Sequence, residues 1–209
     1  MAARGVIPKW LATCLVPRYQ SCPYGRAAKK IWQTKGQTNQ IRTVTKPGQC
    51  VLVDQLESPV PGFKGQNKGS FYQELYKMET IFVYHFSRLS FVYLQESTKG
   101  AETLLAKRAF ETYASSYGVA GTKYHTNNGR VAEAHGQTIS WCGVNVHIQN
   151  GTAETPIHDL TKRARTSLLQ AMHRWPSAVT INIWPYYALQ FTNYNHNAAP
   201  SIKTGQTPL

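Results

Sequence analysis

The stretch at residues 123–160 constrains the fold most, because two strand ends and a helix start follow one another closely in it. Residues 123–129 are typical of a short strand that ends in a polar Asn-Asn-Gly turn. An alternating apolar pattern at 144–148 predicts another strand, followed by a helix that begins near Glu154. Strand ends and helix starts hold side chains at fixed points of a rigid frame, so this stretch is expected to carry a site.

Three further β-rich runs precede this stretch. A short apolar run at residues 50–54 enters Asp54 and is typical of a buried central strand. Runs at 79–87 and 89–96 are rich in β-branched and aromatic residues, and they meet at Ser87-Arg88, which predicts a hairpin. The chain therefore begins its folded part with three strands in succession.

Apolar residues at helical spacing predict helices at 100–117, at 153–175 and, with a bend at Pro185, at 178–198. Gly118 is expected to end the first helix as its C-cap. The predicted apolar face of the first helix comprises Leu105, Ala106, Ala109, Phe110, Tyr113 and Tyr117. That of the second comprises Ile157, Leu160, Ala164, Leu168 and Met172. The aromatic residues of the third, expected to pack in the core, are Trp184, Tyr186, Tyr187, Phe191 and Tyr194.

The charge balance limits the classes of partner. The 209 residues include 23 Lys and Arg but only 10 Asp and Glu, a formal net charge of +13 that suits a polyanion such as nucleic acid. A soluble basic protein with no specific partner is the alternative. Four scattered cysteines form no disulfide framework and indicate a reducing, intracellular setting. No apolar run is long enough to predict a membrane span.

Basic residues gather in two places. Residues 23–49 contain no acidic residue and read as a linker, in which Lys29, Lys30 and Lys35 are candidates for contact with DNA phosphates. A second group, Lys162, Arg163 and Arg165, lies in the predicted helix beyond Glu154. A solvated surface is the alternative for both groups.

Several short motifs occur in a recognisable order: CVLVDQLES at 50–58, TIFVYHFSRLSFVYL at 80–94, YHTNNG at 124–129 and QNGTAE at 149–154. In this order they resemble the integrase catalytic core of copia-type LTR retrotransposons, over roughly residues 47–209. The resemblance implies an α/β, RNase H-like fold, a mixed β-sheet flanked by helices, with an N-terminal basic extension. It also implies that residues 1–46 are the remnant of a zinc-binding segment plus a linker.

The chemistry of that family is phosphodiester cleavage and strand transfer with two divalent ions, Mg²⁺ or Mn²⁺, held by three carboxylates. By resemblance Asp54 and Glu154 are metal ligands and catalytic residues, and Asn127 stands where the third carboxylate belongs. An amide offers one neutral acceptor and removes a negative charge beside two dications. The partners that the resemblance implies are retroelement ends, target DNA and further copies of the chain, in the nucleus.

The chain departs from the family pattern elsewhere too. The span between Asn127 and Glu154 is short, and neither Glu133 nor Asp159, the other acids nearby, occupies a motif position. In the N-terminal segment Tyr19 replaces a ligand, and Cys14 and Cys22 supply two ligands where zinc needs four, so no zinc is expected; an end at Leu209 predicts a truncated copy.

Three functions remain open from the sequence. The first is an integrase-like protein that binds DNA and whose ancestral two-metal chemistry is impaired by Asn127. The second is a nucleic-acid-binding remnant without chemistry. The third is a basic interaction protein whose charge is incidental. The pair of Asp54 and Glu154 favours the first two, and salt-sensitive DNA binding would separate them from the third.

Overall fold

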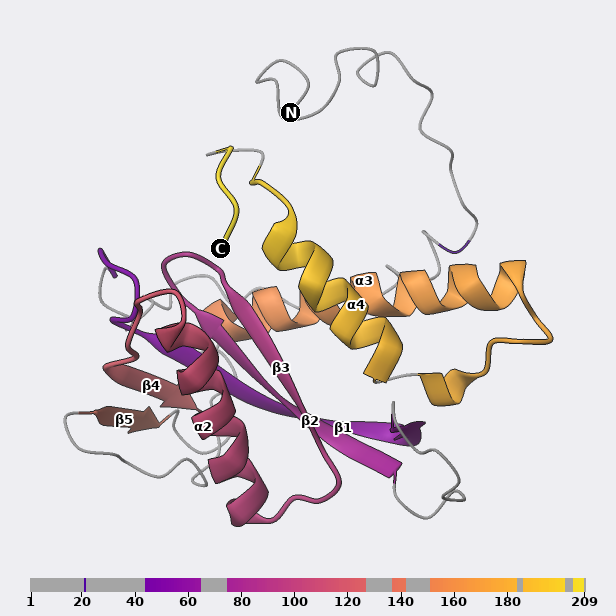
Figure 1. Ribbon diagram of the computed structural model, residues 1–209, viewed down its shortest axis with the longest axis horizontal. Helices are drawn as coiled ribbons and strands as arrows, with labels where there is room; N and C mark the ends of the chain where they lie inside the picture. The colour runs from indigo at the N-terminus through magenta and orange to yellow at the C-terminus, as the bar shows by residue number, and fades with distance from the viewer. Residues whose placement is uncertain are drawn as a thin grey trace, which may run out of the picture.

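A computed structural model describes residues 21, 44–64, 75–126, 137–141, 151–183, 186–201 and 205–208. Five strands, three α-helices and one short 3₁₀ helix are found there (Figure 1). Their bounds are β1 Val51–Phe63, β2 Leu75–Tyr84, β3 Ser90–Gln95, α2 Gly100–Ser115, β4 Lys123–Thr126, β5 Thr138–Trp141, α3 Gly151–Arg174, η4 Ile181–Ile183 and α4 Tyr186–Ala198.

The strands form one mixed sheet in the order β3-β2-β1-β4-β5. The first three strands are joined antiparallel, β1 to β2 and β2 to β3, whereas β4 runs parallel to β1 and β5 runs parallel to β4. The central strand is therefore β1, the strand that carries Asp54. With helices on both faces (Figure 1), this is the RNase H-like arrangement expected from the sequence.

The face of the sheet covered by α3 and α4, here called the α3 face, has an aliphatic core. Leu52, Ile81 and Val83 point into it from β1 and β2, alternating with residues that point the other way. The buried helix residues are Ile157, Leu160, Ala164 and Leu168 from α3, with Ala188 and Leu189 from α4. The predicted apolar stripe of α3 is confirmed, including Met172, which packs at its margin.

The opposite face, here called the α2 face, has an aromatic core. Phe110 of α2 stacks on Phe82 with ring centroids 4.7 Å apart, and it also contacts the rings of Tyr84, Phe91 and Tyr124. The helix ends as predicted. Gly118 has φ +71°, and the N–H groups of Gly118 and Val119 bind back to the last carbonyls of the helix, as in a Schellman motif.

Two predictions for the apolar face of this helix are wrong. Leu105 and Tyr117 were expected in the core, but their side chains are 50% and 49% exposed. Thr103 and Lys107 are buried instead, because the sheet offers them polar partners: Thr103 accepts a hydrogen bond from Gln55, and Lys107 lies over the ring of Tyr124. Because the sheet offers polar partners, the buried stripe of α2 lies on a different side of the helix from the stripe that hydrophobicity predicts.

The last two elements also differ from expectation. The strand predicted at 144–148 lies outside the described residues; the last described strand before α3 is β5, which the sequence did not predict. The single bent helix predicted at 178–198 is divided into η4 and α4. Tyr187, Phe191 and Tyr194 do not join the core; α4 buries its polar stripe against β3, as described below, and turns these rings to solvent.

Candidate active site

Asp54 lies on the central strand, directed to the α3 face. Its register partner in β2 is Ile81, and both neighbours on the same side of β1, Leu52 and Leu56, belong to or pack against the α3-face core. The side chain is half-buried. Its Oδ1 atom accepts the backbone N–H of Gln55 at 2.9 Å, a bond that holds the carboxylate at the sheet surface.

Gln55, the next residue, holds this part of β1 from the other face. Its amide donates to Thr103 Oγ1 at 3.0 Å and to Thr80 Oγ1 at 3.4 Å. Thr80 in turn donates to Gln95 Oε1 at 2.6 Å. Strand β1 at Asp54 is therefore tied to β2, β3 and α2, which gives the carboxylate a rigid support.

The elements next to the other two candidate positions, β4 and α3, both adjoin β1. Val53 pairs in parallel with Thr126, the last described residue before Asn127, which itself lies outside the described residues. The backbone of Glu154 lies in the first turn of α3, the helix that packs on the face to which Asp54 is directed; its side chain is outside the described part. The topology thus brings β1, the end of β4 and α3 together.

Helix α3 begins at Gly151, slightly earlier than predicted, so Pro156 lies beyond the first turn. Proline has no N–H to donate to the carbonyl four residues earlier, that of Thr152. Helix α3 nevertheless runs on through this position, without a break, to Arg174. The apolar stripe from Ile157 onward keeps its helical spacing.

Sequence reasoning missed a second carboxyl on the α3 face. Glu79 on β2 pairs with Leu56 and lies on the same side of the sheet as Asp54. Its side chain is only 1% exposed, and its Oε2 atom has no hydrogen-bond partner among the described residues. Burial raises the pKa of Glu79 to about 8, so the carboxyl is largely neutral at pH 7. The signal in the sequence is its parity with the apolar Ile81 and Val83, two and four positions later.

The two other acids near Asn127 in the sequence, Glu133 and Asp159, gain no support as replacements for the missing carboxylate. Glu133 lies outside the described residues. Asp159 is on α3 between the buried Ile157 and Leu160, and its side chain is exposed. The charge of Asp159 acts on His196 of α4, where it opposes the lowering of the pKa by burial, and no interaction of Asp159 with Asp54 is seen among the described residues. The described residues contain no group of three His, Cys, Asp or Glu side chains arranged to hold a metal ion.

The oxygen donors suit Mg²⁺ or Mn²⁺ in kind, since a hard cation prefers carboxylates, and Asp54 is a half-buried, anchored carboxylate at the sheet surface. Nothing in the described part suits zinc: Cys50 is buried in the α3-face core, and burial raises the pKa of its thiol, against a smaller opposing effect of Lys123. Cys14, Tyr19 and Cys22 lie outside the described residues.

The candidate DNA contacts are only partly described. Lys29, Lys30 and Lys35 lie outside the described residues. In α3, Arg163 and Arg165 are exposed on either side of the buried Ala164, and Lys162 lies nearer to Arg165 around the helix. Arg163 is on the side of α4, where it acts on His196. The three residues therefore form two surfaces and not the single group that their closeness in sequence indicates.

No protein-family model and no curated protein matches this chain. Among solved structures, a chain of the simian T-cell lymphotropic virus intasome in complex with PP2A regulatory subunit B56 gamma is similar, with TM-score 0.57 and 14% identity. The two chains share a fold. The similarity covers 84% of this chain and 58% of that one, so this chain spans a little over half the length of its structural relative.

Two integrase catalytic core domains superpose more loosely. That of BIV integrase gives TM-score 0.49 at 15% identity, covering 77% of this chain and 91% of that one. That of HTLV-2 integrase in complex with magnesium gives 0.48 at 12%, covering 78% and 94%. No helix in the described part of the chain is long and apolar enough to cross a membrane.

Proposed function

We propose that this chain is an integrase-like, DNA-binding protein derived from a two-metal polynucleotidyl transferase. The observation that supports it best is the position of Asp54: a carboxylate on the central strand, on the face that α3 covers with Glu154 in its first turn. The similarity of fold to an intasome chain agrees with this. Asp54 and Glu154 would hold the ion, and residues 47–209 would form the catalytic core-like domain.

The proposed chemistry is impaired in this copy. Divalent ions, when bound at such a site, polarise the phosphodiester and make water a stronger nucleophile. Asp54 supplies one anchored anionic ligand, whereas Asn127 supplies a neutral amide where the family has a carboxylate. Glu79 does not make up the difference, because its buried carboxyl is protonated at neutral pH. We therefore expect weak Mg²⁺ or Mn²⁺ binding, and no strand transfer.

Ion binding tests the site directly. Mn²⁺ titration of the full chain, followed by the electron paramagnetic resonance signal of the free ion, is expected to show weak binding. Asp54→Asn should weaken it about tenfold, and Asn127→Asp should strengthen it about tenfold, since one charge in such a site is worth about 1.4 kcal/mol or more. The matched control is Glu57→Gln, an exposed carboxylate on the same strand. Equal affinities for Asp54→Asn and Glu57→Gln would refute the site.

Strand transfer tests the impairment. A labelled donor duplex and a target plasmid with Mg²⁺ or Mn²⁺ should give no joined product with the unmodified chain. Asn127→Asp is expected to improve ion binding without restoring full activity, because the short span to Glu154 places the ligands imperfectly and a shift of about 1 Å costs roughly 10²-fold. Robust joining by the unmodified chain, abolished by Asp54→Asn, would show that another residue completes the site.

DNA binding without chemistry is the second candidate, favoured by the exposed Arg163 and Arg165 and the net charge of +13. Anisotropy of a labelled duplex should show affinity that falls steeply with salt, as phosphate contacts release counterions. Lys162→Gln with Arg165→Gln should reduce the salt slope by about 2, because two phosphate contacts are lost. Arg108→Gln, an exposed charge on α2, is the control. Binding that does not respond to salt would favour the interaction-protein alternative.

A further inference from the structure

The outer edge of β3 is the strongest feature that the proposed function leaves unused. β3 is an edge strand, and an edge strand presents backbone N–H and C=O groups that no neighbouring strand pairs. Tyr84 N–H donates to Leu89 O across the β2–β3 turn, which sets the alternation of the ladder. With the register of these strands, the backbone groups of Ser90, Val92 and Leu94 point outward, away from β2.

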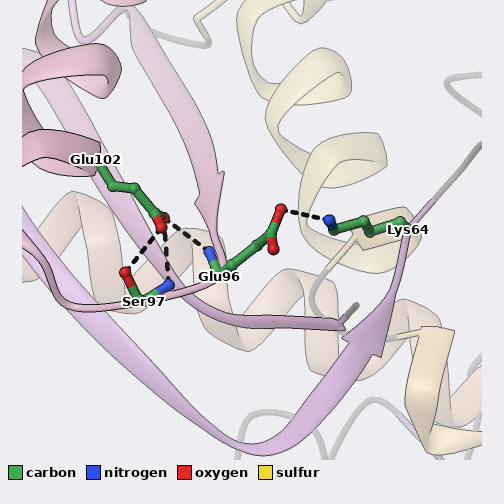
Figure 2. A network of polar contacts seen from close by, with 4 residues as sticks. All are labelled: Lys64, Glu96, Ser97 and Glu102. Carbon is green, nitrogen blue, oxygen red and sulfur yellow. Dashed lines mark hydrogen bonds and ion pairs between the residues drawn. The ribbon is translucent and has the colours of Figure 1, made fainter. Parts of the chain in front are cut away.

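Side chains cover both ends of this edge. Asn197 of α4 accepts the N–H of Ser90 at 3.0 Å and donates to its carbonyl at 2.6 Å. Gln190 donates to the carbonyl of Val92 at 2.9 Å. Beyond the other end, the carboxylate of Glu102 accepts the N–H of Glu96 at 2.9 Å (Figure 2). These amides and this carboxylate act as substitutes for a sixth strand, which explains why α4 buries its polar side.

A short gap remains between the two caps. The outward N–H and C=O of Leu94 have no recorded hydrogen bond to any described residue, and this residue lies in a groove of about 600 Å³. Helix α2 forms one wall of the groove with the half-exposed Leu105 and with Ala109, and α4 forms the other wall with Gln190. An uncovered backbone segment and a partly apolar groove therefore coincide, on a strand whose edge is otherwise protected.

The charge of the groove is opposite to that of the chain. The charged side chains that line it, Glu96 and Glu102, are both acidic, although the net charge is +13. Burial acts to raise the pKa of Glu102, but hydrogen bonds from Ser97 and Glu96 outweigh it and lower the pKa (Figure 2). Glu96 pairs with Lys64 at one side (Figure 2), yet its side chain stays 49% exposed. A cation in the groove would therefore share Glu96 with Lys64, and would meet Glu102 beside Lys99, the other cation that acts on it.

We propose that the edge of β3 at Leu94 is a docking site for an extended segment of a partner protein, added as a short strand, with a lysine or arginine beside Glu96 and Glu102. Main-chain hydrogen bonds to Leu94 supply the anchor, as in strand addition generally. Side chains at alternate positions of the segment contact Leu105 and Gln190. The site does not involve Asp54 and stands independently of the proposed catalysis.

Leu94→Pro tests the main-chain anchor. Proline removes the outward N–H while leaving the β2–β3 ladder its hydrogen bonds, a position that edge strands tolerate. Leu94→Ala, which keeps the N–H, is the matched control. The probe is a fluorescein-labelled, end-capped Lys-Thr-Val-Thr-Val-Thr peptide, followed by anisotropy with the full chain. Leu94→Pro should weaken binding about tenfold relative to Leu94→Ala, the equivalent of about 1.4 kcal/mol for lost main-chain bonds.

Two further measurements keep the proposal open to refutation if Leu94→Pro fails to fold. An N-methylated form of the probe should bind the unmodified chain about tenfold more weakly, because it lacks N–H donors. Glu96→Gln should weaken binding of the lysine probe about threefold and leave a probe with threonine in place of lysine unchanged. The proposal is overturned if N-methylation has no effect, if the probe does not bind at millimolar concentration, or if sedimentation shows that Leu94 instead joins two copies of this chain.

Discussion

The two faces of the sheet are built from different chemistry. The α3 face is closed by an aliphatic stripe from Ile157 to Leu168 and carries two carboxyls, Asp54 at its edge and Glu79 inside. The α2 face is closed by stacked aromatic rings around Phe110 and by buried polar groups, among them Lys107. The α3 face thus combines an aliphatic core with the candidate site. The α2 face has a core of aromatic and polar groups, and hydrogen bonds on this face hold β1.

The difference indicates what each face contributes. The carboxylate of Asp54 needs a support that does not move, and hydrogen bonds from Gln55 to Thr80 and Thr103 provide it from the α2 face. Aliphatic packing has no such directional contacts, so it holds α3, the helix of the candidate residue Glu154, without fixing the direction of single side chains. We infer that the α2 face supports β1 through directional hydrogen bonds, whereas the α3 face carries the candidate site.

The largest effect is expected from Phe110→Ala on the α2 face. Phe110 is fully buried and contacts four other rings, so its loss leaves a large cavity and should lower the free energy of unfolding by about 4 kcal/mol. Urea denaturation followed by circular dichroism measures it. Leu105→Ala on the same helix, half-exposed, should change stability by less than about 0.5 kcal/mol. A loss for Phe110→Ala as small as that would show that the aromatic cluster does not hold this face.

The second effect concerns Glu79 on the α3 face. Burial raises its pKa from 4.5 to about 8, so the folded chain keeps a proton that the unfolded chain releases. The contribution of this bound proton to the free energy of unfolding is fully present below about pH 4.5 and is lost as the pH rises towards 8. Between pH 5 and pH 7 the free energy of unfolding should therefore fall by about 2 to 3 kcal/mol, at roughly 1.4 kcal/mol per pH unit.

Paired denaturation curves at the two pH values isolate this contribution. Glu79→Gln removes this titrating group and should remove its contribution to the difference, while Glu57→Gln, an exposed carboxylate on β1, should keep it. The same slope in Glu79→Gln as in the unmodified chain would mean that the side chain reaches water in the folded protein.

The sequence predicts the α3 face better than the α2 face, for a physical reason. Aliphatic burial follows helical periodicity, so Ile157, Leu160 and Ala164 were correctly placed. Burial on the α2 face depends on partners from distant strands: Thr103 is buried because Gln55 lies opposite, and nothing near Thr103 in the sequence indicates this. Leu105 was assigned to the core because hydrophobicity was the only signal near it in the sequence, and the strand partners that decide burial on this face were not known.

The candidate site was predictable in part. The apolar run before Asp54 predicted a central strand, and its direction follows from alternation once the α3-face core is known. Glu79 was missed because a carboxyl is assumed to face water, although its parity with Ile81 places it inside. The exposure of Tyr187 and Phe191 was missed because the polar side of α4 is used to cover the edge of β3, a requirement set by tertiary structure alone.

A smaller effect is expected from Thr103→Val, which keeps the shape of the side chain and removes the acceptor for Gln55. The net value of one such hydrogen bond predicts a loss of about 1 kcal/mol in the free energy of unfolding. Because Gln55 supports the strand at Asp54, Mn²⁺ affinity should also decrease. Thr112→Val, an exposed position on the same helix, is the control. A loss of stability with unchanged Mn²⁺ affinity would contradict the support assigned to the α2 face.

The smallest effect on stability is expected from Lys107→Met. A small effect would show that the buried charge of Lys107 contributes little to the stability of the α2 face. The Lys107 side chain is 2% exposed, and its ammonium nitrogen lies 3.8 Å from the carboxylate of Glu111 and 4.9 Å from the ring centroid of Tyr124. Removing a charge from water costs about as much as such contacts return, so an apolar side chain of similar length should change the free energy of unfolding by less than about 1 kcal/mol. Lys77→Met, exposed on β2, gives the baseline for losing a surface charge. A loss of several kcal/mol for Lys107→Met alone would show that charge, and not ring packing around Phe110, holds the α2 face together.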